Sequence, residues 1–170
     1  MPDEKYQLAE ELVKELAVRS KMLTIVESCT GGLFTDAVTH IPGASRVLWG
    51  TFVAYTADAK IAMLGVDTID CFGAVSRETA VAMAERAIER STANVSVAIT
   101  GIAGPDGDRT DTPVGTVWIA VVCREVADTT AVTEVFHLSG SRNQIRESAT
   151  CKALEKVIAT LKESKTIIED

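Results

Sequence analysis

The stretch that decides the fold runs from Met22 to Val38 and reads MLTIVESCTGGLFTDAV. Its first part, residues 22–26, is mostly apolar and too short for a helix, so we expect a buried strand there. Residues 27–32 break that strand with polar residues and paired glycines. Apolar residues with helical spacing then continue up to the Ile-Pro-Gly stop at residues 41–43. The stretch therefore predicts a strand, a tight turn and a helix in succession.

The segments on either side extend this alternation of helices and strands. Residues 4–18 place their apolar side chains on one stripe of an amphipathic helix. Residues 47–55 are rich in β-forming residues and predict a second strand. Thr56 then caps a helix that ends near Gly65, and Ser76 caps the helix that follows.

The second half of the chain adds three strands and a long helix. Residues 95–100 predict a buried strand that leads into a loop rich in glycine and proline. The β-prone runs 114–123 and 130–138 are separated by a short polar stretch, which favours an antiparallel pair. Residues 141–144 have the spacing of a capping box, and a helix is expected behind them.

These elements predict an α/β fold, namely a three-layer α/β/α sandwich with a mixed parallel and antiparallel sheet. The chain has 170 residues, of which 46% are hydrophobic and 24% charged, enough for one sizeable core and a polar surface. We therefore expect one domain over residues 1–170, with residues 164–170 as a flexible tail.

Composition also excludes several classes of protein. A net charge of −7 opposes the phosphate attraction on which nucleic-acid binding rests, so no nucleic-acid partner is expected. No apolar run is long enough to span a membrane, and the N-terminus lacks a secretory signal, which predicts a cytoplasmic protein without a membrane partner. The four cysteines form no Cys-x-x-Cys pair and there are only two histidines, so we expect no metal site and no disulfide.

Two features of the sequence favour an anion-binding site. Gly31 and Gly32 follow a strand and begin a helix, where backbone N–H groups can approach an anion closely. The alternative is that the glycines only permit a sharp turn. Arg142 falls in the first turn of its helix, where a bound anion would relieve its conflict with the helix dipole; alternatively its side chain bends away into solvent. Neither the ATPase P-loop nor the dinucleotide-binding glycine motif is present.

A nucleophilic serine is suggested by the same turn. Ser28 lies where a buried strand breaks, a geometry that exposes a hydroxyl beside backbone donors. Cys29 is a rival nucleophile next to it, and position alone does not separate the two. Such a serine needs a base, and His40 and His137 are more typical of surface or structural histidines.

Lys60 is the alternative base. Its immediate neighbours are apolar, and Asp58, two positions away, points to another side of the helix, so the amine can be held neutral. The competing interpretation is an ordinary solvated lysine. Tyr55 precedes this helix and either relays a proton beside the lysine or simply buries its ring.

Five sequence blocks, taken together, resemble the CinA C-terminal domain family over residues 6–160. The blocks are ESCTGG at 27–32, Tyr55 with Lys60 and LGV at 64–66, GAVS at 73–76, TGIAGP at 100–105, and PVGTV at 113–117. The resemblance implies a nicotinamide-nucleotide amidase, which hydrolyses the carboxamide of nicotinamide mononucleotide to nicotinic acid mononucleotide and ammonia. It also implies a homo-oligomer and a reaction that needs no metal and no cofactor.

The resemblance further implies roles for individual residues. Ser28 becomes the nucleophile, Lys60 the general base, Tyr55 an assisting group and Arg142 a substrate contact. Together with Arg142, the implied substrate-binding residues are Thr30, Gly31, Gly32, Thr100 and Gly101. Backbone N–H groups after the serine would stabilise the oxyanion of an acyl-enzyme mechanism.

Some positions depart from the usual family pattern. They are Gly50-Thr51, Thr56-Ala57, and Asp111-Thr112, which stands where Glu-Lys is typical. If that lysine helps to neutralise a phosphate, substrate affinity is expected to be lower, and Arg109 partly compensates.

The chain shows only the amidase-like portion, so no pyrophosphatase activity is expected. Two other functions stay open: a non-catalytic nucleotide-binding module, or an amidase for a different primary amide. An apolar strand edge near residues 130–138 favours self-association.

Overall fold

The computed structural model of the chain describes residues 2–164. The helices are α1 (Pro2–Val18), α2 (Leu33–Thr39), α3 (Ala57–Leu64), α4 (Ile69–Phe72), α5 (Arg77–Glu89) and α6 (Arg142–Glu163), with a 3₁₀ turn η1 (Ala44–Arg46). The strands are β1 (Leu23–Glu27), β2 (Leu48–Val53), β3 (Val95–Gly101), β4 (Thr116–Arg124) and β5 (Thr129–His137). Except for Ser164, the predicted tail lies outside the described residues.

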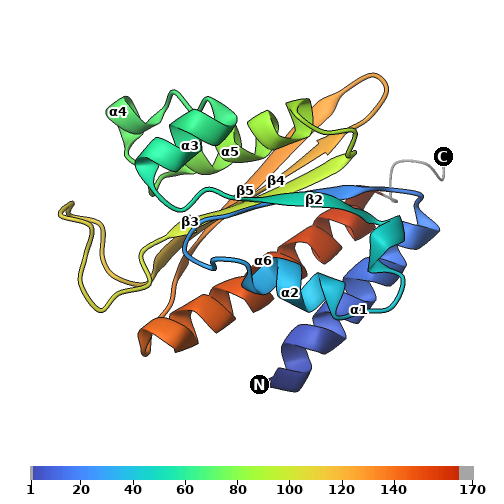
Figure 1. The fold of residues 1–170 in the computed structure, drawn as a ribbon, viewed down its shortest axis with the longest axis horizontal. Coiled ribbons are helices and arrows are strands. Elements are labelled where there is room, and N and C mark those ends of the chain that lie inside the picture. Colours follow the sequence, from blue (N-terminus) through green and yellow to red (C-terminus); the bar gives the residue numbers. More distant parts are fainter. Residues whose placement is uncertain (1, 165–170) are drawn as a thin grey trace.

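The strands form one five-stranded sheet in the order β2-β1-β3-β4-β5. Strand β1 is parallel to both of its neighbours, β2 and β3, whereas β4 is antiparallel to β3 and to β5. Helices α3, α4 and α5 cover one face of the sheet, and α1, α2 and α6 cover the other (Figure 1). The predicted three-layer α/β/α sandwich with a mixed sheet is confirmed.

Local signals define most helix ends. The Thr56 hydroxyl accepts a hydrogen bond from the Ala59 N–H, and Gly65 ends α3 in the left-handed conformation, as expected. Ser76 caps α5, and the capping box before α6 is present. The short helix α4 and the turn η1 were not predicted, because each is too brief to show a helical period.

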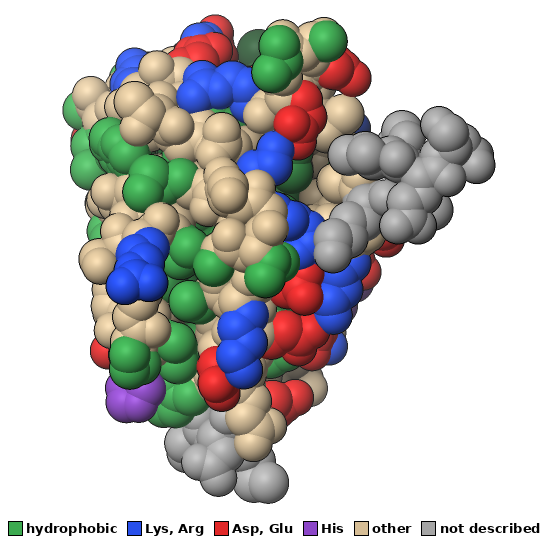
Figure 2. Space-filling model, turned by 90° about the vertical axis from the view of Figure 1, so that its right-hand side faces the viewer, with side chains coloured by type: hydrophobic (Ala, Val, Ile, Leu, Met, Phe, Trp, Pro, Cys, Tyr) green, Lys and Arg blue, Asp and Glu red, His purple; other side chains and the backbone are tan. Residues whose placement is uncertain are grey.

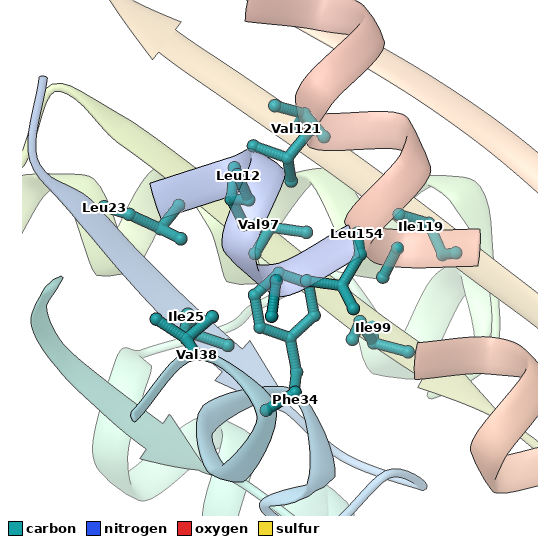
Figure 3. Close-up of a cluster of buried hydrophobic side chains, with 14 of the residues drawn as sticks. Leu12, Leu23, Ile25, Phe34, Val38, Val97, Ile99, Ile119, Val121 and Leu154 are labelled. Carbon is teal, nitrogen blue, oxygen red and sulfur yellow. The ribbon is translucent and has the colours of Figure 1, made fainter. Parts of the chain in front are cut away.

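Two buried clusters hold the layers together, one on each face of the sheet. On the α1/α2/α6 side, the Phe34 ring lies among Val97, Ile99 and Leu154 (Figure 3). Strand β1 is buried along its whole length because helices cover both of its faces. The turn that follows β1 therefore starts from a strand that is held firmly on both faces.

The described surface mixes charges of both signs. On the face shown in Figure 2, acidic and basic side chains are interspersed, and hydrophobic side chains form small groups beside them. Among the described residues, no helix combines the length and the apolar character needed to cross a membrane.

Candidate active site

Most of the predicted site residues meet at the carboxyl ends of the parallel strands. The chain leaves β1 toward α2 on one face of the sheet, and leaves β2 toward α3 on the other face (Figure 1). Ligands of open α/β sheets typically bind where connections diverge in this way. A cleft of about 230 Å³ opens at this edge. Its lining includes Ser28, Cys29, Tyr55, Lys60, Ala74, Val75, Thr100, Gly101, Asp106, Asp108 and Arg142.

Ser28 and Lys60 lie within hydrogen-bond distance of each other. The Lys60 Nζ is 2.8 Å from the Ser28 Oγ, and it also lies 3.1 Å from the carbonyl oxygen of Ala54 and 3.3 Å from that of Tyr55. Only 2% of Lys60 and 5% of Ser28 is exposed. The Lys60 amine of helix α3 thus lies beside the turn after β1, at the edge of the sheet.

Burial controls the charge of this amine. Desolvation lowers the pKa of Lys60 from 10.5 to about 8, and the nearby Cys29 thiol acts weakly in the opposite direction. Among the described residues, no carboxylate lies within ion-pair distance of the Nζ. A neutral amine can donate its two N–H groups to the Ala54 and Tyr55 carbonyls and direct its lone pair at Ser28. That arrangement suits a general base.

The rival groups are less suited to this chemistry. Cys29 lines the cleft, but burial raises the pKa of its thiol to about 11, so the reactive thiolate is disfavoured at neutral pH. His40 follows the end of α2 and packs against the Tyr6 ring. His137 ends β5. Neither histidine lines the cleft.

Tyr55 and Arg142 form the outer wall of the cleft. The Arg142 guanidinium donates to the Tyr55 hydroxyl at 2.7 Å and to the Gly104 carbonyl at 2.6 Å. These contacts hold the guanidinium at the cleft, so no bound anion is needed to explain its position. Tyr55 is 51% exposed, so the alternative of a buried ring is wrong.

The expected anion cradle at Gly31 and Gly32 is occupied by the chain itself. The Glu27 carboxylate is fully buried and accepts hydrogen bonds from the N–H groups of Gly32, Phe34 and Thr35. The Gly31 N–H donates to the Ser28 carbonyl. These groups are therefore not free for a substrate phosphate. Thr30, Gly31 and Gly32 are also absent from the cleft lining.

Thr100 and Gly101, at the end of β3, do line the cleft. The Thr100 hydroxyl donates to the Ala74 carbonyl at 2.8 Å and so ties the loop before α5 to the sheet. A Cβ on Gly101 would lie 2.7 Å from the Val117 side chain and 2.8 Å from the Thr116 carbonyl oxygen. Only glycine fits here, because β4 passes so close.

Comparison with known proteins places the chain in a family. A family model described as the CinA C-terminal domain matches residues 5–161. The chain belongs to the CinA C-terminal domain family. A CinA-like protein of Thermotoga maritima is 41% identical over 162 residues, which are 94% of this chain and 38% of the relative. A CinA-like protein of Chlorobium limicola is 38% identical over 92% of this chain and 37% of its own length. The resemblance inferred from the sequence blocks is confirmed, and the chain spans well under half the length of these relatives.

Solved structures share the fold of this CinA domain. The competence/damage inducible protein CihA from Agrobacterium tumefaciens has a TM-score of 0.86 at 42% identity, covering 92% of this chain and 94% of that one. A competence-damaged protein (CinA) superfamily protein from Escherichia coli has a TM-score of 0.86 at 34% identity, covering 92% and 90%.

Two groups around the turn at residues 28–32 of this CinA domain, here named the nucleophile turn, were not predicted from the sequence. One is the Glu27 carboxylate beneath the start of α2. The other is Arg146, which donates to the Cys29 and Thr30 carbonyls. A signal existed for Arg146, because residues four apart share a helix face and Arg142 had already been assigned to the site. Asp111, at one departure from the family pattern, and Arg109, the residue expected to compensate for it, are both exposed and do not line the cleft.

Proposed function

We propose that this CinA domain is a serine–lysine amidase that hydrolyses nicotinamide mononucleotide to nicotinic acid mononucleotide and ammonia. The observation that carries the proposal is the 2.8 Å contact between the Lys60 Nζ and the Ser28 Oγ, made by a buried amine. A nucleophile and a base in hydrogen-bond contact inside a cleft are the minimum that acyl transfer requires.

In the acylation step, the Ser28 Oγ attacks the carboxamide carbon while its proton passes to the neutral Lys60 amine. The tetrahedral intermediate then loses its C–N bond. The Lys60 ammonium gives its proton to the departing nitrogen, which leaves as ammonia, and an ester on Ser28 remains.

In the deacylation step, water attacks this ester and passes a proton to Lys60. The C–O bond to Ser28 breaks, the proton returns to the Ser28 Oγ, and the carboxylic acid is released. The same amine serves as base and acid in both halves, which favours a pKa near the working pH.

Backbone donors after Ser28 are suited to stabilising the oxyanion. The N–H groups of Cys29 and Thr30 have no acceptor within hydrogen-bond distance among residues 2–164. Free N–H groups beside a nucleophile are the usual components of an oxyanion hole. Cys29 itself lines the cleft.

Arg142 is the proposed contact for the ribose phosphate. Its guanidinium lines the cleft and uses one N–H for Gly104 and one for Tyr55, which leaves further donors for an anion. This role replaces the cradle at Gly31 and Gly32. It also predicts that free nicotinamide, which lacks the phosphate, is a poorer substrate.

Ammonia release from nicotinamide mononucleotide tests the proposal. We expect turnover by the wild type and loss of turnover in Ser28→Ala. Ser96→Ala is the matched control, because Ser96 is also buried, lies in β3, and its hydroxyl makes no hydrogen bond to the described residues. Equal turnover by the wild type and Ser28→Ala would refute the serine assignment. Binding of the nucleotide without ammonia release would instead indicate a non-catalytic binding module.

A substrate comparison tests the choice of amide. Nicotinamide mononucleotide should be hydrolysed with a much higher kcat/KM than free nicotinamide, because only the nucleotide has a phosphate for Arg142 to bind. Equal kcat/KM for the two compounds would remove the anion-site argument and favour an amidase for a different primary amide.

A further inference from the structure

Arg146 contacts the nucleophile turn without lining the cleft. It lies on α6, and its Nε donates to the Cys29 carbonyl at 3.1 Å while an Nη donates to the Thr30 carbonyl at 3.0 Å. Cys29 and Arg146 are 117 positions apart in the sequence. The contact therefore ties the turn to the long helix of the opposite layer.

These two hydrogen bonds fix the orientation of two peptide groups. In a trans peptide the C=O and the N–H point in opposite directions. The Cys29 carbonyl shares its peptide with the Thr30 N–H, so holding that carbonyl toward α6 directs the Thr30 N–H away from α6. The Thr30 carbonyl shares its peptide with the Gly31 N–H, which donates to the Ser28 carbonyl at 3.1 Å.

The nucleophile turn is also anchored at its other end. The Glu27 carboxylate accepts the N–H groups of Gly32 and Thr35 at 2.9 Å each, and the Thr35 hydroxyl at 2.7 Å. An anion thus binds the N–H groups that begin α2, while the Arg146 cation binds the carbonyls just before them. Charged partners make stronger hydrogen bonds than neutral ones, so the turn is held firmly between them.

We propose that Arg146 is a positioning residue for the amidase reaction: by holding the Cys29 carbonyl it orients the Thr30 N–H, so that this group, together with the Cys29 N–H, stabilises the oxyanion. The proposal rests on the proposed function. Because the N–H groups of Cys29 and Thr30 have no acceptor in the described part of the chain, they are available for a charge that develops only during the reaction. Arg146 should therefore affect kcat far more than KM.

The main test compares Arg146→Gln and Arg146→Lys with Arg124→Gln. Arg124 is the matched control, because its guanidinium also donates to backbone carbonyls, those of Ile88, Ser91 and Ala93. It lies at the end of β4 beside the start of β3, the opposite end from the site. We expect Arg146→Gln to lower kcat about 30-fold or more with KM changed less than about 3-fold, and Arg146→Lys to lose less. Arg124→Gln should keep kcat within about 2-fold.

Chemical rescue separates positioning from loss of the fold. Guanidinium ion at millimolar concentration should restore part of the kcat of Arg146→Ala, and it should not raise kcat in Arg124→Gln. Equal kcat in wild type and Arg146→Gln would overturn the proposal. So would equal losses in Arg146→Gln and Arg124→Gln, or no rescue by guanidinium together with no activity in Arg146→Lys.

Labelling by a fluorophosphonate distinguishes failure of this proposal from failure of the proposed function. The reagent reacts with an activated serine and uses the same oxyanion donors, but it needs no amide substrate. Mass spectrometry measures the rate at which Ser28 is labelled. Slower labelling in Arg146→Gln than in the wild type supports the positioning role even if nicotinamide mononucleotide is not hydrolysed. Equal labelling rates in wild type and variant would overturn the positioning role whatever the substrate.

Discussion

Lys60 is a charged residue type in an environment that favours its neutral form. It is one of the largest fully buried side chains of the protein, and its polar partners are one hydroxyl and two backbone carbonyls. Carbonyl dipoles replace only part of the hydration of an ammonium, so burial lowers the pKa of Lys60 to about 8. A base with that pKa is partly neutral at physiological pH and is strong enough to accept a proton from serine.

The pH dependence of the reaction should report this pKa. We expect kcat/KM for nicotinamide mononucleotide to rise about tenfold per pH unit below pH 8 and to level off above it, because only the neutral amine acts as base. Initial rates from pH 6.5 to 9 measure this. Lys60→Met should lose at least about a hundredfold in turnover and show no such step. A flat wild-type profile, or near-normal turnover by Lys60→Met at pH 7, would exclude the general-base role.

The same pKa predicts a pH dependence of stability. The pKa of Lys60 is about 8 in the folded chain and 10.5 for a solvated lysine. Between these values the unfolded state binds more protons than the folded state, so the unfolding free energy should rise with pH. The unfolding free energy should begin to rise near pH 8 and should level off above about pH 10.5.

Urea unfolding of wild type and Lys60→Met at a series of pH values isolates this contribution. The difference in unfolding free energy, wild type minus variant, should increase with a slope of up to about 1.4 kcal/mol per pH unit between pH 8 and 10.5. Parallel curves over that range would show that Lys60 titrates normally in the folded protein.

At the scale of elements, two helix N-termini shape the site by different means. At the start of α2, the buried Glu27 carboxylate accepts hydrogen bonds from the first N–H groups of the helix, the place where a substrate anion was expected. Helix α6 begins with a capping box, in which the Ser141 hydroxyl and the Gln144 amide each accept the other's backbone N–H. That cap fixes the first turn of α6, where Arg142 is the first residue.

Ser141→Ala tests the link between this cap and the substrate contact. Loss of the cap should lower the unfolding free energy by about 1 kcal/mol. Because Arg142 follows directly, fraying of the first turn should raise KM for nicotinamide mononucleotide while kcat changes little. Steady-state kinetics together with thermal unfolding measure both effects. An unchanged KM in a destabilised variant would show that Arg142 does not depend on the cap.

A substitution at Gly101 tests how closely β3 and β4 must approach beside the cleft. Gly101→Ala should destabilise the protein by about 1–3 kcal/mol, because the new methyl group would overlap the Thr116 carbonyl oxygen and the Val117 side chain. Gly50→Ala in β2 is the matched control, because a Cβ there meets nothing within 4 Å. Urea unfolding of the two variants measures the contrast, and equal stability would contradict the packing argument.

At the scale of the whole molecule, the site exists only because the layers converge on one edge of the sheet. Ser28 follows β1, Lys60 comes from α3 above the sheet, and Arg142 and Arg146 come from α6 below it (Figure 1). Thr100 reaches the same edge from β3. No single element carries enough of these groups to perform the chemistry.

Self-association stays a prediction at this scale. Strands β2 and β5 are the two edges of the sheet, and edge strands present unpaired backbone groups to other chains. Light scattering of the wild type should give a mass above 18.1 kDa, that of one chain. Ala131→Lys places a charge on the exposed part of β5 and should lower that mass if the predicted edge is used. A monomeric wild type, or an unaffected variant, would contradict association through β5.

Short-range physics in the sequence determined the elements of this protein. The polarity break after β1 marks the nucleophile turn, the hydroxyl caps Thr56, Ser76 and Ser141 mark helix starts, and two adjacent β-prone runs give the antiparallel pair of β4 and β5. Each signal acts over a few neighbouring residues, so one sequence is enough to reveal it. The sequence blocks also carried the family resemblance, and with it the pairing of Ser28 with Lys60.

Only the tertiary structure decided which groups face one another. Ser28 and Lys60 are 32 positions apart, and the arginine that holds the nucleophile turn is 117 positions from it. Hydrophobic burial drives the layers together but has no direction, so the apolar pattern does not specify which helix end meets which strand end. The sequence likewise left open that Glu27 would turn inward and occupy the start of α2, because the choice between a carboxylate of the chain and a bound anion depends on the space left once the layers are packed.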